Sequence, residues 1–130
     1  MRIFKAVSAV LLTISTSAAL AAPPKVLVTH NLTDVDSNAF IAGTIPSQHP
    51  TRAHSDNKVI WASVRVACYG HIVAGRCSAM IKMETNTETP VELGMVSINL
   101  ANGDIEPKLI EANGYRMTVD GPAETTLSRI

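Results

Sequence analysis

Four side chains able to ligate a metal or contact a polar partner lie between Pro46 and Asn57. His49, His54 and Asp56 offer the imidazole and carboxylate ligands that zinc and copper accept. Arg52, in the same segment, is a candidate binding residue. The segment has two prolines and few apolar residues, which predicts a surface loop. Because loops on a rigid scaffold often carry binding residues, it is the first candidate for a functional surface, the alternative being an exposed connector with solvated histidines.

A second polar stretch, Asp34 to Asn38, begins with the Asp-x-Asp-x-Asn pattern of a calcium loop. An EF-hand loop also needs glycine at its sixth position and glutamate at its twelfth. Those positions hold Ala39 and Ile45. The sequence therefore favours a turn rich in Asp and Asn over a calcium site.

The chain has two cysteines, Cys68 and Cys77. An isolated even pair in an exported protein favours a structural disulfide, whereas a redox or metal pair usually has the Cys-x-x-Cys spacing. With both thiols in a disulfide, neither is free to act as a nucleophile, and no serine lies in a Gly-x-Ser-x-Gly elbow. A hydrolase with a cryptic site remains the third functional hypothesis.

Two segments around the cysteines, 59–69 and 76–85, are predicted to be antiparallel strands because β-branched residues alternate along them. If Cys68 lies opposite Cys77, Val66 faces Ala79 and Val64 faces Ile81, so that one face is apolar. This register predicts a hairpin disulfide across neighbouring strands.

Further strands are expected at 25–30 and 39–45, and near 125–127. Asn102-Gly103 and Asn113-Gly114 each predict a type I′ hairpin turn, so that residues 95–120 form a three-stranded meander. The turns place Leu100 opposite Ile105, Ile110 opposite Met117, and Glu111 opposite Arg116. Seven or eight strands without helical periodicity predict an all-β fold, a small antiparallel sandwich of immunoglobulin-like type, with a small β-barrel as the alternative.

The first 21 residues have the features of a secretory signal peptide. Arg2 and Lys5 precede an apolar run, and Ala19-Leu20-Ala21 matches a cleavage site. Residues 22–130 then form one domain with 9 basic and 11 acidic side chains, since the whole chain has 11 of each. The charges form no basic stripe, so neither nucleic acid nor an anionic membrane surface is an expected partner. We expect a periplasmic or secreted protein without a membrane span after cleavage.

These observations lead to a binding protein as the first functional hypothesis, with a protein partner and no cofactor. The binding surface is expected on loops at one end of the sandwich or on a sheet edge. A zinc- or copper-binding protein that uses His49, His54 and Asp56 is the second.

Overall fold

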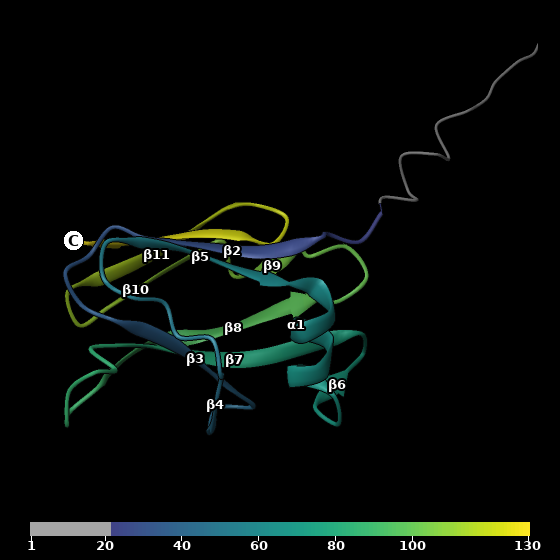
Figure 1. Ribbon diagram of the computed structural model, residues 1–130, viewed down its shortest axis with the longest axis horizontal. Coiled ribbons are helices and arrows are strands. Elements are labelled where there is room, and N and C mark those ends of the chain that lie inside the picture. The colour runs from purple at the N-terminus through teal and green to yellow at the C-terminus, as the bar shows by residue number, and fades with distance from the viewer. Residues whose placement is uncertain (1–21) are drawn as a thin grey trace, which may run out of the picture.

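Alternating apolar residues along the strands bring two β-sheets together face to face (Figure 1). The computed structural model describes residues 22–130, so the predicted signal peptide lies outside the described residues. The predicted β-sandwich is confirmed.

The β5 sheet contains, in spatial order, β10 (Leu109–Ala112), β11 (Tyr115–Gly121), β12 (Glu124–Arg129), β2 (Val26–Asn31) and β5 (Ser55–Ile60). The β7 sheet contains β4 (Ile45–Pro46), β3 (Ser37–Ile41), β7 (Arg76–Met83), β8 (Val91–Asn99) and β9 (Ile105–Glu106), and β6 (Ile72–Val73) pairs with β7.

Strand pairing is antiparallel except between β12 and β2, which run parallel. This pairing joins the last strand to the first and completes the β5 sheet. Along β11, Tyr115 and Met117 point inward, and along β12 Thr125 and Leu127 do the same. The residues between them face solvent, as the period of two requires.

The core consists of two clusters of buried side chains, most of them small or medium in size. One lies near the disulfide and includes Trp61 and Val64, and the other includes Met83, Tyr115 and Leu127. The whole chain has one tryptophan, two tyrosines and two phenylalanines, and only Trp61 and Tyr115 among them are buried in the described core. Few bulky groups are therefore available to fill the space between the sheets.

The predicted strand 59–69 is wrong beyond Ile60, where the chain forms helix α1 (Trp61–Cys68). The residues that α1 buries are Trp61, Val64 and Cys68, which are spaced by three and four and share one helical face. Val66, placed on the apolar strand face by sequence, is 75% exposed. Indole Nε1 of Trp61 donates to the carbonyl of Leu100 at 3.2 Å and holds α1 against the loop after β8.

The Cys68–Cys77 disulfide is confirmed, with the two Cα atoms 5.9 Å apart. It joins the end of α1 to β7 rather than two paired strands, so the predicted hairpin register is wrong. β7 pairs instead with β3, β8 and β6. Ala79, expected opposite Val66, pairs with Ile41 and Val96.

The two Asn-Gly turns differ from each other. At Asn113-Gly114 both residues have positive φ, and Ile110 pairs with Met117 and Glu111 with Arg116, as predicted. At Asn102-Gly103 only the glycine has positive φ, so this is not a type I′ turn.

The predicted meander at 95–120 is also wrong. Ile105 pairs with Ile98 rather than with Leu100. The chain then leaves the β7 sheet after β9 and enters the β5 sheet at β10. Within the described residues, no helix has the length and apolar character needed to span a membrane.

The predicted loop 46–57 is shorter and better anchored than the sequence suggested. Its last residues, from Ser55, belong to β5. Thr51 is buried and forms a bridge with Ser37 of β3, with both backbone hydrogen bonds at 2.8 Å. The amide of Asn57 donates to the carbonyl of His49 at 2.9 Å. The loop therefore connects the edges of the two sheets as a fixed element.

Candidate functional site

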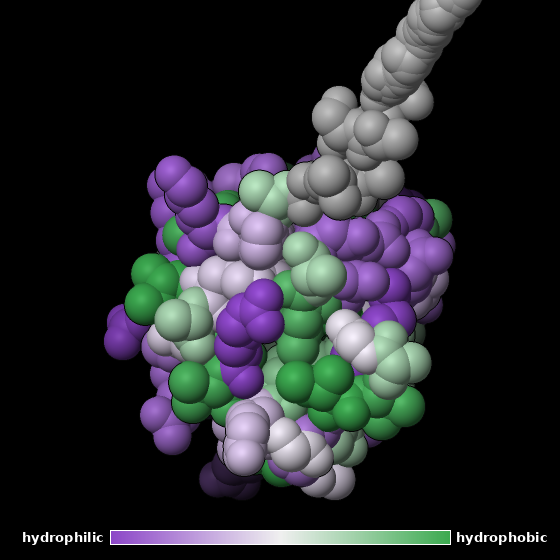
Figure 2. Space-filling view, turned by 90° about the vertical axis from the view of Figure 1, so that its right-hand side faces the viewer, coloured by the Kyte–Doolittle hydropathy of each residue, from purple (hydrophilic) through white to green (hydrophobic). Residues whose placement is uncertain are grey.

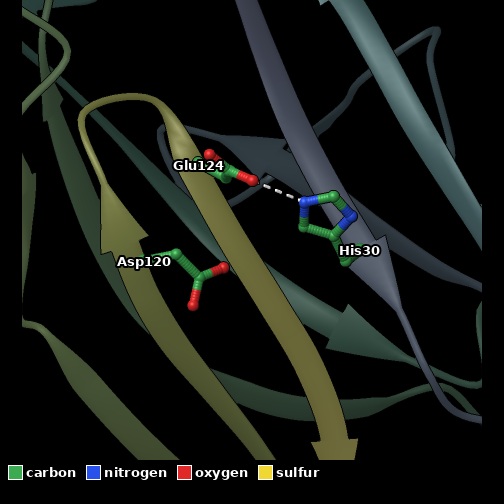
Figure 3. A group of neighbouring side chains, drawn as sticks. All are labelled: His30, Asp120 and Glu124. Atoms are coloured by element: carbon green, nitrogen blue, oxygen red, sulfur yellow. Dashed lines mark hydrogen bonds and ion pairs between the residues drawn. The ribbon is translucent and has the colours of Figure 1, made fainter.

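Three neighbouring strands place an imidazole between two carboxylates on the outer face of the β5 sheet. His30 of β2 pairs in register with Asp56 of β5 and with Thr126 of β12. His30 Nδ1 lies 2.7 Å from Asp56 Oδ1, and His30 Nε2 lies 2.6 Å from Glu124 Oε2. Figure 3 shows the imidazole of His30 pointing across to Glu124, with the carboxylate of Asp120 on the adjoining strand.

The two carboxylates favour the protonated imidazolium. The hydrogen bond with Glu124 raises the pKa of His30 above its usual 6.5, and the hydrogen bond with Asp56 raises it further. An imidazolium donates from both nitrogens, which matches the two short contacts. The neutral ring has only one N–H donor, so it loses one of these two hydrogen bonds.

The same cluster has the geometry of a cation site. One ligand atom each from His30, Asp120 and Glu124 lies within 4.8 Å of the others. The hydrogen bond between Asp56 and Nδ1 orients the ring, and Nε2 lies on the side of the other two carboxylates. This arrangement resembles the carboxylate–histidine pairs of metal sites. The Thr126 hydroxyl donates to Asp120 at 2.6 Å and fixes that carboxylate. Nitrogen and oxygen ligands of this kind suit zinc.

The structure does not bring the predicted ligands His49, His54 and Asp56 together. Among the described residues, the group of three metal-ligating side chains is the one formed by His30, Asp120 and Glu124. Asp56 contacts His30 on β5 instead. His49 lies at the mouth of an interior cavity, and His54 has a positive φ and donates its backbone N–H to Thr33.

Arg52 and the Asp34–Asn38 stretch make contacts within the domain. Arg52 is exposed, and its carbonyl accepts from the amide of Asn31 at 3.1 Å. Asp36 accepts from the backbone of Ala53 at 2.9 Å, and Asp34 pairs with Arg129 at 2.7 Å. The Arg129 guanidinium lowers the pKa of Asp34. These contacts fit the polar turn expected from the sequence.

A second surface feature lies at the end of the sandwich that carries α1 and β6. Of ten large apolar side chains exposed in residues 22–130, six belong to β4, α1, β6 or the residues next to α1. Figure 2 shows apolar side chains gathered on this end of the molecule. We call this surface the α1 end, and its exposed apolar residues are Ile45, Ile60, Val66, Tyr69, Ile72 and Val73.

A groove of about 450 Å³ crosses the α1 end between β4 and the helix. Ile45 and Pro46 form one wall, and Ala62 and Val66 form the other. A separate cavity of about 150 Å³ lies between the two sheets. The groove and the cavity share five lining residues, so they meet below the loop after β4: Ile41, Ser47, His49, Ser63 and Ala67.

The interior cavity has an energetic consequence. The space opens to solvent through the groove, and the apolar side chains along its walls lose packing contacts that a filled core would provide. Small residues such as Ala39 and Ala79 leave the space open, where larger aliphatic residues fill it in most cores.

Sequence reasoning missed both surface features for identifiable reasons. The alternation of β2 places His30 on an outer face, and this signal was available. Its partners Asp120 and Glu124 lie about 90 residues further along the chain, and only the parallel β12–β2 pairing brings Glu124 close. The α1 end does not follow from the sequence because the alternation in residues 59–69 predicts a strand, whereas the structure has a helix at residues 61–68.

Comparison with known proteins identifies relatives. A family model described as "T2SS substrate NttC" matches residues 1–130. The crystal structure of the Legionella pneumophila type II secretion system substrate NttC is 50% identical in sequence. The match covers 82% of this chain and 99% of that one, with a TM-score of 0.81. No curated protein sequence matches the chain. The chain thus belongs to the NttC family of type II secretion system substrates and is a secreted protein.

Proposed function

We propose that this secreted protein acts by binding another protein at the α1 end, without catalysis. The exposed apolar residues on α1 and β6 carry this proposal. Soluble proteins seldom expose an apolar patch larger than a few hundred Å² unless it serves as an interaction site. Tyr69 is 84% exposed at the end of the helix, and tyrosine is a common anchor in protein interfaces.

Charge supports a protein partner over a membrane or nucleic acid. The domain as a whole has two more acidic than basic side chains, so its net charge does not attract anionic lipids or phosphates. The groove between β4 and α1 offers a recess for an apolar side chain of a partner. The disulfide fixes α1 on β7, so the surface is preformed.

The His30 cluster does not favour hydrolysis. Both ring nitrogens of His30 are occupied by carboxylates, which leaves no nitrogen to accept a proton from a nucleophile. The nearby Thr126 hydroxyl donates to Asp120 rather than to the imidazole. This arrangement supports a binding role.

We also propose that the chain reaches the outside through the type II secretion system, with residues 1–21 as the signal peptide for a periplasmic step. The family match supports the secretion route, and the pattern of Arg2, Lys5 and Ala19-Leu20-Ala21 supports the cleavable leader.

Site-specific photo-crosslinking tests the protein partner. A photoreactive residue replaces Tyr69 in one variant and Leu109 in another, because Leu109 is also exposed but lies on β10. The variants are incubated with envelope proteins or with extracts of target cells. We expect a discrete adduct from position 69 only, and its loss when Val66→Asp is added. Equal crosslinking from both positions, or an adduct with only a second copy of the chain, contradicts the proposal.

The second candidate function is zinc binding at His30, Asp120 and Glu124, which the 4.8 Å spacing favours. Calorimetric titration of untagged protein with zinc tests it. His30→Gln and Asp120→Asn should abolish binding, and Asp56→Asn should weaken it about 10- to 100-fold by freeing the ring. His49→Gln is the matched control and should leave the affinity unchanged. If only His49→Gln abolishes binding, the zinc site lies in the loop that contains His49 and not at His30.

A further inference from the structure

We infer that the cavity between the sheets binds a small, mostly apolar molecule that has one hydrogen-bonding group, such as a substituted phenol. This inference goes beyond the proposed protein partner and concerns the interior space that opens into the groove of the α1 end. The cavity measures about 150 Å³, and an engineered apolar cavity of that size in another protein stays dry and binds benzene. One aromatic ring is therefore the size of molecule that fits.

The lining decides the chemistry of the ligand. The walls from the β7 sheet are aliphatic, with Ala79, Ile81 and Val96, and the β5 sheet contributes Leu27 and Leu127. No charged carboxylate or amine is among the lining residues. An ion entering this space loses its hydration without a counter-charge, so a neutral molecule is favoured.

Thr125 supplies a polar point inside the cavity. It is 5% exposed and lines the space. Within residues 22–130 its hydroxyl makes no side-chain hydrogen bond, although most buried hydroxyls have a partner. Thr29 lies beside it in the parallel β12–β2 register and lines the same space. A ligand hydroxyl or carbonyl reaching Thr125 satisfies this group.

Access is provided at one edge of the sandwich. Ser47, His49 and Ser63 line both the cavity and the surface groove, so the two spaces meet at a polar mouth. His49 lies on the loop that links β4 to β5, and Ser63 lies on α1. The sequence-predicted loop thus takes part as the entrance rather than as a metal site.

Titration of the domain with phenol and with benzene, followed by two-dimensional NMR, tests the inference. Both should shift signals of interior residues such as Ala79 and Val96, and phenol should bind about two- to tenfold more tightly because it can bond to Thr125. Thr125→Val keeps the shape of the side chain and should remove the advantage of phenol, which then binds no more tightly than benzene. A wild-type domain in which neither molecule shifts interior signals overturns the inference.

Filling variants distinguish the cavity from the groove. Ala79→Leu should abolish binding, while Ala62→Leu, which lines only the groove, should leave it unchanged. If Ala79→Leu does not fold, Val96→Ile adds a single methylene and should weaken binding. Unchanged affinity in a folded filling variant overturns the interior site. These variants spare Tyr69 and Val66, so failure here is separable from failure of the protein-binding proposal.

Discussion

His30 has a different role from the histidines that the sequence singled out. The loop histidines His49 and His54 are close in sequence, whereas His30 gains its partners by strand pairing. Its ring contacts Asp56 and Glu124 from two neighbouring strands, and Asp120 lies close by. Three carboxylates around one imidazole leave the cluster with excess negative charge, which favours either a protonated ring or a bound cation.

The protonation of His30 gives a stability prediction. Because its folded pKa is raised above 6.5, the ion pairs are fully present below about pH 6.5 and are lost as pH rises through the folded value. The melting-temperature difference between the wild type and His30→Gln should therefore shrink as pH increases from 6 to 9 in metal-free buffer. The NMR titration midpoint of His30 should lie above 6.5 and fall in Glu124→Gln. A midpoint at or below 6.5 contradicts the assigned contacts.

The helix α1 shows how one short segment satisfies two periodicities. Ile60, Val64 and Val66 alternate as in a strand, yet Trp61, Val64 and Cys68 also lie at helical spacing. Eight residues are too few for periodicity to separate the two. Packing of Trp61 against the Leu100 loop and the bond from Cys68 to β7 favour the helix.

The disulfide should contribute measurably to the stability of this element. It closes a segment with a sequence separation of 9, which in the loop-entropy model corresponds to about 2.5–3 kcal/mol. The double variant Cys68→Ser, Cys77→Ser should lower the unfolding free energy in urea by about that amount. Trypsin should then cut after Arg65 in α1 faster than in the wild type, with Arg116 in β11 as the comparison site. An unchanged urea midpoint would show that the bond contributes nothing.

At the scale of the whole molecule, the two sheets are joined at Gly103. Its carbonyl accepts from Ala123 at 2.8 Å, which ties the loop after β8 to the turn before β12. A Cβ at Gly103 comes within 2.5 Å of Pro24 Cγ and 3.2 Å of the Ala123 backbone nitrogen. The N-terminal lead, the β8–β9 loop and the last turn therefore meet at a position where only glycine fits.

Two matched substitutions test this junction. Gly114 has a similar positive φ, but a Cβ there meets nothing within 4 Å. Gly114→Ala should lower the free energy of unfolding only by the backbone penalty of about 1 kcal/mol. Gly103→Ala adds a steric clash and should cost about 2–3 kcal/mol, part of which Pro24→Ala should restore. Equal losses in denaturant unfolding at the two glycines contradict the close approach.

The sequence by itself determined the features that depend on local rules. Period-two alternation predicted most strands, the isolated cysteine pair predicted the disulfide, and Asn113-Gly114 predicted a hairpin with its register. These features depend on residues near one another in the chain or on composition alone, so no knowledge of distant pairing is needed.

Only the tertiary structure decided the helix, the His30 cluster and the interior cavity. The parallel pairing of β12 with β2 joins segments about 95 residues apart, and no local pattern specifies that neighbour. The cavity is the space that small residues on both sheets leave unfilled, so it exists only once the sheets are packed. The His30 cluster and the cavity arise where non-local pairing brings distant residues together, whereas most of the α1 end comes from one stretch of the chain and depends on that stretch forming a helix.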